Sequence, residues 1–202
     1  MQTSDAATRK QYIESKNLAK VIFSYSHDDA VCVQYHPRGI PGGMMPELDS
    51  HTPSATNPTP LASPYSPWHA CGPDYPHYSS AMKRRSHLRL LGATLRLAPG
   101  QSDTEGAARQ WQDYFGIGRA RSDLVFTNAK LKFVPGVDGL PEGLESITIE
   151  VKGKDIFDKM LDIASKEGLC GDGWVNMLGV KWYFILKDEK GGAGKDRNQS
   201  KL

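Results

Sequence analysis

The chain of 202 residues lacks any apolar run that approaches the about 18 residues needed to cross a membrane. Its amino-terminal stretch has no apolar signal-peptide core, so secretion is not expected. With 25 basic and 23 acidic residues, the net charge is only +2, and the basic stripe typical of nucleic-acid binders is missing. The sequence therefore predicts neither a membrane span nor a nucleic-acid partner.

Cysteine is scarce as well. Cys32, Cys71 and Cys170 are too few and too widely spaced for a disulfide framework or a zinc motif. We interpret them as reduced thiols in an intracellular compartment. The sequence also lacks a Ser-His-Asp order, a CxxC pair and a HExxH helix, so it offers no obvious covalent nucleophile.

The carboxyl-terminal tail, residues 188–202, is polar and rich in glycine. Such a segment buries too little apolar surface to offset its ordering entropy and is predicted to be disordered. It ends in Ser200, Lys201 and Leu202, the S-K-L tripeptide that the peroxisomal import receptor reads as a free C-terminal peptide. This predicts import from the cytosol into the peroxisomal matrix, and deletion of the three residues is expected to abolish that import.

The rest of the chain divides into three parts. Residues 1–49 are predicted to hold a short helix and two strands, at 18–26 and 30–36, because these runs are rich in β-branched and aromatic residues. Residues 50–86 form a proline-rich crossover, expected to be extended and partly polyproline. Its aromatic side chains favour an ordered cover over the core rather than a plain linker.

Residues 87–187 are more regular. A strand followed by a helix occurs at 91–115 and again at 145–167, about fifty residues apart, which is within the range of an internal structural repeat. Further strands follow each helix, including a hairpin near residue 128. The second helix is predicted to bury an apolar face made of Ile156, Phe157, Met160, Leu161, Ile163 and Ala164.

This repeated strand-helix-strands plan resembles the vicinal-oxygen-chelate (glyoxalase-like) superfamily, and its fungal-type domain in particular. VQYHPRGIPGGMMPELDSH looks like a module end and crossover, LLGATLRLA with AARQWQDYFGI like the start of the next module, and SDLVFTNAKLKFVPG with GLESITIEV like its remaining strands. The resemblance implies an α+β fold in which paired βαβββ modules form curled mixed sheets around a ligand cavity, joined by the proline-rich crossover.

The chain departs from this family pattern in two ways. We interpret it as starting inside the first module, which leaves open a shortened form, an incomplete start or completion by a homodimer. The superfamily's metal-dependent members carry a His on the first strand of each module and a Glu on the last. The corresponding strands here carry Gly92, Thr94, Ser146 and Tyr183, which are poor ligands for a divalent metal. A metal cofactor is therefore left open.

The best candidates for chemistry lie in the stretch PELDSH. Glu47, Asp49 and His51 alternate, so their side chains face one way if the stretch is extended. A carboxylate with an imidazole can act as a general base and acid or hold a metal, and His36 is a candidate to join them across the sheet. The alternative is a solvated loop in which Asp49 and His51 only cap a turn.

Five further residues are candidates for contact with a ligand. Trp68 and His69 are candidates for a lid over the cavity, the alternative being a buried staple over the core. The others are Tyr35, Met44 and Met45.

The resemblance implies an enzyme that acts on a small carbonyl or enol metabolite by proton transfer, as an isomerase or a lyase. Glu47 or Asp49 would be the base and His51 or His36 its acid partner. A non-catalytic small-molecule binder and an inactive subunit of the same fold are the alternatives.

Overall fold

The computed structural model describes residues 1–187, except for residues 28, 56, 66 and 73. The predicted tail with Ser200, Lys201 and Leu202 therefore lies outside the described residues. None of the helices in the described part of the chain has both the length and the apolar character needed to cross a membrane.

The central part of the chain forms one complete βαβββ module. It consists of β4 (Leu88–Arg96), α3 (Thr104–Phe115), β5 (Gly118–Ala120), β6 (Asp123–Val125) and β7 (Lys130–Val134). The first strand, β4, pairs parallel with the last, β7, and the other pairs are antiparallel. Asp103 caps α3 by accepting a hydrogen bond from Gly106 N at 2.7 Å, and Gly116 ends the helix with a left-handed φ of 70°.

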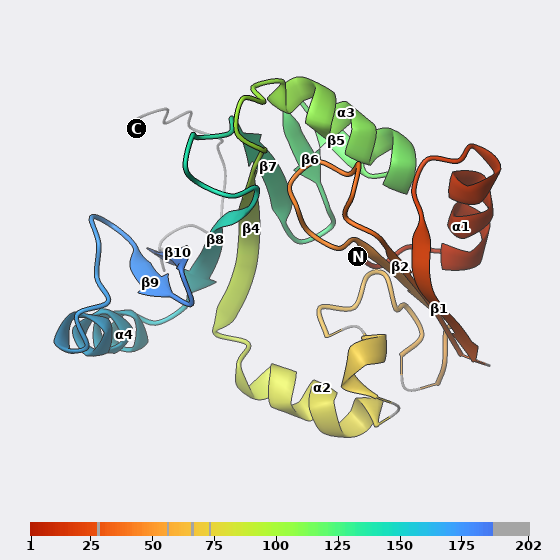
Figure 1. Ribbon diagram of the computed structural model, residues 1–202. Helices are drawn as coiled ribbons and strands as arrows, with labels where there is room; N and C mark the ends of the chain where they lie inside the picture. The colour runs from red at the N-terminus through yellow and green to blue at the C-terminus, as the bar shows by residue number, and fades with distance from the viewer. Residues whose placement is uncertain (28, 56, 66, 73, 188–202) are drawn as a thin grey trace.

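The carboxyl-terminal part repeats the plan with one strand fewer. It contains β8 (Gly143–Val151), α4 (Lys154–Lys166), β9 (Val175–Met177) and β10 (Val180–Leu186). Strand β8 pairs antiparallel with β4 and parallel with β10, which gives one seven-stranded mixed sheet in the order β5-β6-β7-β4-β8-β10-β9. The predicted internal repeat is therefore present, and its two copies meet through their first strands (Figure 1).

The prediction for α4 needs correction. Of its six expected core residues only Ala164 is buried. Ile156 is exposed, and Ile163 is 50% exposed. The periodicity of the sequence identifies an amphipathic helix but not the surface that covers it. Helix α4 lies at the end of the sheet beside β9 and β10, where little of the described chain packs against it (Figure 1).

The amino-terminal part contains α1 (Ala6–Ser15), β1 (Val21–His27), β2 (Ala30–Tyr35) and β3 (Glu47–His51). The strands form an antiparallel sheet in the order β1-β2-β3. Gln2 adds a parallel bridge to Asp49 of β3, just as β4 lies parallel to β7 in the complete module. Helix α1 and the bridge at Gln2 thus lie relative to this sheet as α3 and β4 lie in the complete module.

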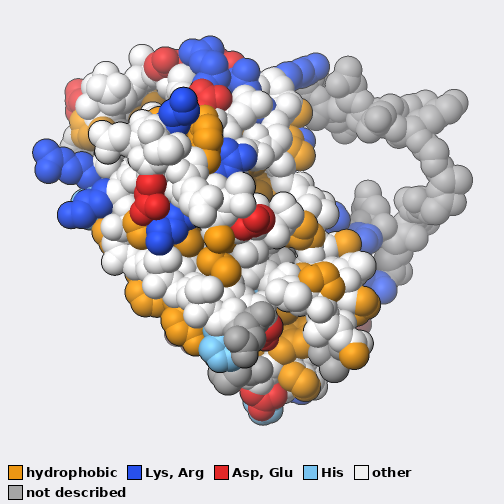
Figure 2. All heavy atoms as spheres, turned by 90° about the vertical axis from the view of Figure 1, so that its right-hand side faces the viewer, with side chains coloured by type: hydrophobic (Ala, Val, Ile, Leu, Met, Phe, Trp, Pro, Cys, Tyr) orange, Lys and Arg blue, Asp and Glu red, His pale blue; other side chains and the backbone are white. Residues whose placement is uncertain are grey.

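A single core joins the amino-terminal sheet to the complete module. Ile13, Val33 and Leu48 from the first part pack in the same cluster as residues of α3 and its sheet. The rings of Tyr35 and Phe115 lie 5.7 Å apart across this junction. The outer surface of the amino-terminal part also carries hydrophobic groups. Ile22, Phe23 and Tyr25 of β1 are exposed, and Figure 2 shows hydrophobic side chains scattered over the face that it draws.

The proline-rich crossover is more regular than the sequence predicts. It contains η1 (His69–Cys71) and the helix α2 (Tyr75–Arg84), where an extended segment was expected. Pro76 lies in the first turn of α2. Backbone N–H groups in the first turn of a helix have no acceptor within the helix, so the N–H that proline lacks costs no hydrogen bond there. Asp74 caps the helix by accepting a hydrogen bond from His77 N at 3.1 Å.

Candidate functional site

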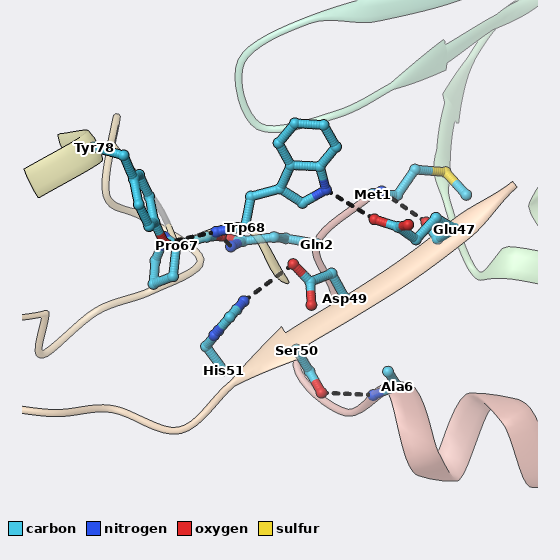
Figure 3. Close-up of polar contacts among 10 residues, drawn as sticks. All are labelled: Met1, Gln2, Ala6, Glu47, Asp49, Ser50, His51, Pro67, Trp68 and Tyr78. Carbon is cyan, nitrogen blue, oxygen red and sulfur yellow. Dashed lines mark hydrogen bonds and ion pairs between the residues drawn. The ribbon is translucent and has the colours of Figure 1, made fainter. Parts of the chain in front are cut away.

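The predicted site residues lie on β3, which places them on one face of the amino-terminal sheet. Glu47, Asp49 and His51 point away from α1, toward the crossover segment that carries Pro67 and Trp68 (Figure 3). The alternate residues point toward the helix: Leu48 is in the core and Ser50 Oγ accepts a hydrogen bond from Ala6 N at 3.2 Å. The extended conformation assumed from the sequence is therefore present, and it gives the three side chains a common direction.

Asp49 and His51 form a buried pair. His51 Nε2 lies 3.0 Å from Asp49 Oδ2, and the two side chains are only 9% and 1% exposed, respectively. A carboxylate on one ring nitrogen fixes the orientation of the ring and favours the tautomer in which that nitrogen carries the proton. The other nitrogen, Nδ1, is then an acceptor. The arrangement can accept a proton at Nδ1 and stabilise the resulting imidazolium.

Glu47 is held differently. Its Oε1 accepts a hydrogen bond from Trp68 Nε1 at 2.8 Å, and its Oε2 accepts one from Gln34 Nε2 at 2.7 Å. Both oxygens thus already have donors. The hydrogen bond from Trp68 holds the crossover segment against strand β3, so Glu47 has a structural contact there (Figure 3).

Cys32 lies directly across from Asp49 in the register of β2 and β3. Burial, followed by the nearby Glu47 and Asp49 carboxylates, raises the pKa of its thiol to about 12. The thiol therefore stays protonated at neutral pH and is a poor nucleophile.

This predicts that a thiol reagent such as DTNB modifies only Cys71 and Cys170 of the native protein at pH 8, because both are exposed whereas Cys32 is buried and protonated. Unfolding in guanidinium should release the third thiol. Rapid reaction of all three thiols in the native protein would contradict this placement of Cys32, and a Cys32→Ala variant identifies which thiol reacts.

Two cavities flank the Asp49–His51 pair. The junction cavity, of about 700 Å³, lies between the amino-terminal sheet, the crossover and the end of α3, and its lining includes Gln2, Asp49, Trp68 and Phe115. The tyrosine cavity, of about 540 Å³, has a lining that includes Tyr25, His51, Asn57, Tyr75 and Tyr78. Asp49 faces one cavity and His51 the other, so the pair crosses the wall between them.

The remaining candidates lie elsewhere. His36 is exposed at the far end of β2, where its Nδ1 accepts a hydrogen bond from Arg38 N at 3.0 Å. Tyr35 is in the core against Phe115, and burial raises the pKa of its hydroxyl to about 12. The structure therefore does not bring either residue to the Asp49–His51 pair.

The candidates from the loop and crossover are also separated. Met44 and Met45 are exposed, and neither belongs to the described lining of the two cavities. Trp68 does line the junction cavity, half exposed, over Glu47. His69 begins η1, but its side chain lies outside what the structure describes.

The residues present do not fit the metal centre that the superfamily resemblance implies. Among the described residues, no three His, Cys, Asp or Glu side chains come together as a metal site. Gly92 and Thr94 of β4 lie in register with Thr148 and Ser146 of β8, which offers hydroxyls and a glycine where imidazole and carboxylate would be needed. The facing atoms of Asp49 and His51 are engaged with each other.

Sequence reasoning missed several residues of this site. Tyr25, Asn57 and Tyr78 come from a strand, a loop and a helix, and they meet only in the folded chain. Alternation along 30–36 could have placed Cys32 beside Asp49, given the correct partner strand. No local sequence pattern around Asn57 identifies it as a residue of the cavity.

Comparison with known proteins adds information about the fold. No protein-family profile matches the chain. No curated protein matches it either. Among solved structures, the crystal structure of BphC, a halotolerant catechol dioxygenase, superposes with a TM-score of 0.50 at 10% sequence identity, over 94% of this chain and 68% of that chain.

At this identity the likeness concerns the fold alone, and it does not distinguish the fungal type of domain. It agrees with the curled, unclosed mixed sheets and the repeated strand-helix-strands modules described above. The chain therefore has an α+β fold similar to that of this dioxygenase, with curled, unclosed mixed sheets.

Proposed function

We propose that the protein is an enzyme that transfers a proton on a small carbonyl or enol compound, as an isomerase or a lyase, at the Asp49–His51 pair. The observation that carries this proposal is the buried 3.0 Å contact between the two side chains at the wall of the tyrosine cavity. A buried carboxylate that orients an imidazole beside a cavity is the arrangement that general acid–base chemistry requires.

In the proposed reaction, His51 Nδ1 takes a proton from the carbon next to the substrate carbonyl, and the C–H electron pair moves into an enolate. Asp49 holds the proton on Nε2 and stabilises the imidazolium by its charge. Return of the proton to a different carbon gives isomerisation, and loss of a leaving group from the enolate gives a lyase step. Asp49 acts as a positioning residue, and no step uses a metal.

Glu47 is less suited to the role of base. Trp68 and Gln34 donate hydrogen bonds to its two oxygens, so both oxygens are already engaged within the protein. These two hydrogen bonds to Glu47, together with the absence of metal-binding side chains at Gly92 and Ser146, favour the second candidate function. That function is non-catalytic binding of small molecules. Ligand-dependent melting without turnover would support that alternative.

The proposal is tested by following exchange of carbon-bound protons for deuterium in a panel of small 2-oxo acids and diketones by NMR. The wild-type protein is expected to accelerate exchange in at least one of them, and His51→Gln should abolish that acceleration. His36→Gln is the matched control, because His36 is exposed and lies away from the pair. Full exchange with His51→Gln would overturn the assignment.

A further inference from the structure

Asn57 carries a buried hydrogen-bond donor that the described chain leaves unused. The side chain is 5% exposed, and its Nδ2 has no hydrogen-bond partner among the described residues. The backbone of Asn57 is fixed by a turn, in which its N–H lies 3.1 Å from both Ser54 O and Ser54 Oγ, and its carbonyl accepts from Ser54 N at 3.0 Å. The amide is therefore held in place while its donor lacks an acceptor.

Burying an amide donor without an acceptor is unfavourable, and native proteins rarely leave such groups unpaired. A group of this kind inside a cavity is explained when a bound molecule supplies the acceptor. Asn57 lines the tyrosine cavity together with His51, so the missing acceptor would lie beside the group that exchanges protons.

The other walls of the tyrosine cavity suit a flat ligand. The rings of Tyr75 and Tyr78 pack edge to face with centroids 5.5 Å apart, and those of Tyr25 and His27 are parallel with centroids 6.3 Å apart. Aromatic faces and edges of this kind contact planar conjugated groups favourably. A cavity of about 540 Å³ is large enough for a molecule of one or two rings.

Tyr78 supplies a second donor. Its hydroxyl oxygen accepts a hydrogen bond from Trp68 N at 3.1 Å, which leaves the O–H hydrogen available (Figure 3). Burial is the largest cause that raises the pKa of Tyr78, so the hydroxyl keeps its proton at neutral pH. The donors Asn57 Nδ2 and Tyr78 O–H and the imidazole of His51 thus belong to residues that line the same cavity. Such a lining favours a ligand with several hydrogen-bond acceptors.

We propose that the tyrosine cavity binds a planar, conjugated compound with a carbonyl, enolate or carboxylate oxygen, and that Asn57 Nδ2 donates a hydrogen bond to that oxygen. This inference rests on the proposed function in one respect, since the same cavity would hold the substrate of His51. It goes further by naming the substrate class and the group that recognises the oxygen.

The test uses three probes of similar shape: benzoate, acetophenone and toluene, which carry a carboxylate, a carbonyl and no oxygen. Affinities are measured by NMR titration with the full chain. The wild-type protein is expected to bind both oxygenated probes more tightly than toluene. Asn57→Leu keeps the branching and the number of side-chain heavy atoms but removes the donor, so it should weaken benzoate binding by about 10- to 100-fold and acetophenone by about fivefold, with toluene unchanged.

Melting of the free protein provides an independent readout. Removing an unpaired buried donor should leave Tm unchanged or raise it by about 2–4 °C in Asn57→Leu. A fall in Tm with unchanged affinity for all three probes would show a structural role and overturn the inference, as would tighter binding of toluene than of benzoate by the wild type. Asn57→Asp provides a second variant, in which benzoate should lose more affinity than acetophenone through charge repulsion.

The two proposals fail in different ways. If the oxygenated probes bind through Asn57 but His51→Gln leaves proton exchange intact, the proposed reaction is wrong and the binding site stands. If exchange depends on His51 but Asn57→Leu changes neither binding nor exchange, the reaction stands and the assignment of Asn57 is wrong.

Discussion

Replacing Asp49 by Asn is expected to slow proton exchange by about 10²- to 10⁴-fold, the range attributed to a positioned acid–base group. The amide keeps the size of the carboxylate but removes the negative charge that stabilises the imidazolium. Its NH₂ group can also donate to His51 Nε2, which would favour the tautomer with the proton on Nδ1 and so block the base. The measurement is the NMR exchange rate on the substrate found for the wild-type protein.

Asp162→Asn is the matched control for this prediction. It makes the same chemical change on the exposed face of α4, where Asp162 pairs with Lys166 at 2.6 Å. Such surface pairs contribute little, so both exchange and stability should stay at wild-type values. Equal exchange rates in Asp49→Asn and Asp162→Asn would refute the role of the buried pair.

The largest expected effect on stability comes from Trp111→Ala, which should lower the free energy of unfolding by about 3–5 kcal/mol. Trp111 is 4% exposed on α3 and contacts Phe115 and Phe133 at ring-centroid distances of 5.2 and 5.9 Å. Its removal leaves a cavity at the centre of the shared core. For a chain of this length the change corresponds to a fall in Tm of about 6–20 °C, measured by circular dichroism.

Trp111 also holds the loop that leads into β3. Its Nε1 donates a hydrogen bond to Pro41 O at 2.9 Å. Trp111→Phe retains most of the ring packing but loses this bond, so it should cost less than the Ala variant, about 1–3 kcal/mol. If Trp111→Ala melted within 2 °C of wild type, the shared core described here would be wrong.

Local geometry explains how much of the candidate site the sequence predicts. Glu47, Asp49 and His51 fall on one side because side chains alternate along any extended strand, whatever lies around it. The repeated strand-helix units at 91–115 and 145–167 are readable for the same reason: the periods of helices and strands are properties of the local backbone.

The structure departs from the sequence predictions in two places, one decided by single local positions and one by packing between distant parts of the chain. Helix α2 forms in a proline-rich segment because Pro76 falls in its first turn and Asp74 caps it, a matter of single positions rather than composition. Helix α4 has the apolar pattern of a core helix, yet Ile163 is half exposed because the described chain does not cover it.

The sequence by itself determined the strand-helix periodicity, the shared face of Asp49 and His51, and the lack of metal-binding residue types at Gly92 and Ser146. Only the tertiary structure decided that Asp49 pairs with His51 rather than with His36, and that Asn57 and Tyr78 share one cavity with His51. The physical reason is range: backbone periodicity is set by neighbours along the chain, whereas a cavity is closed by segments that are far apart in sequence and adjacent only after folding.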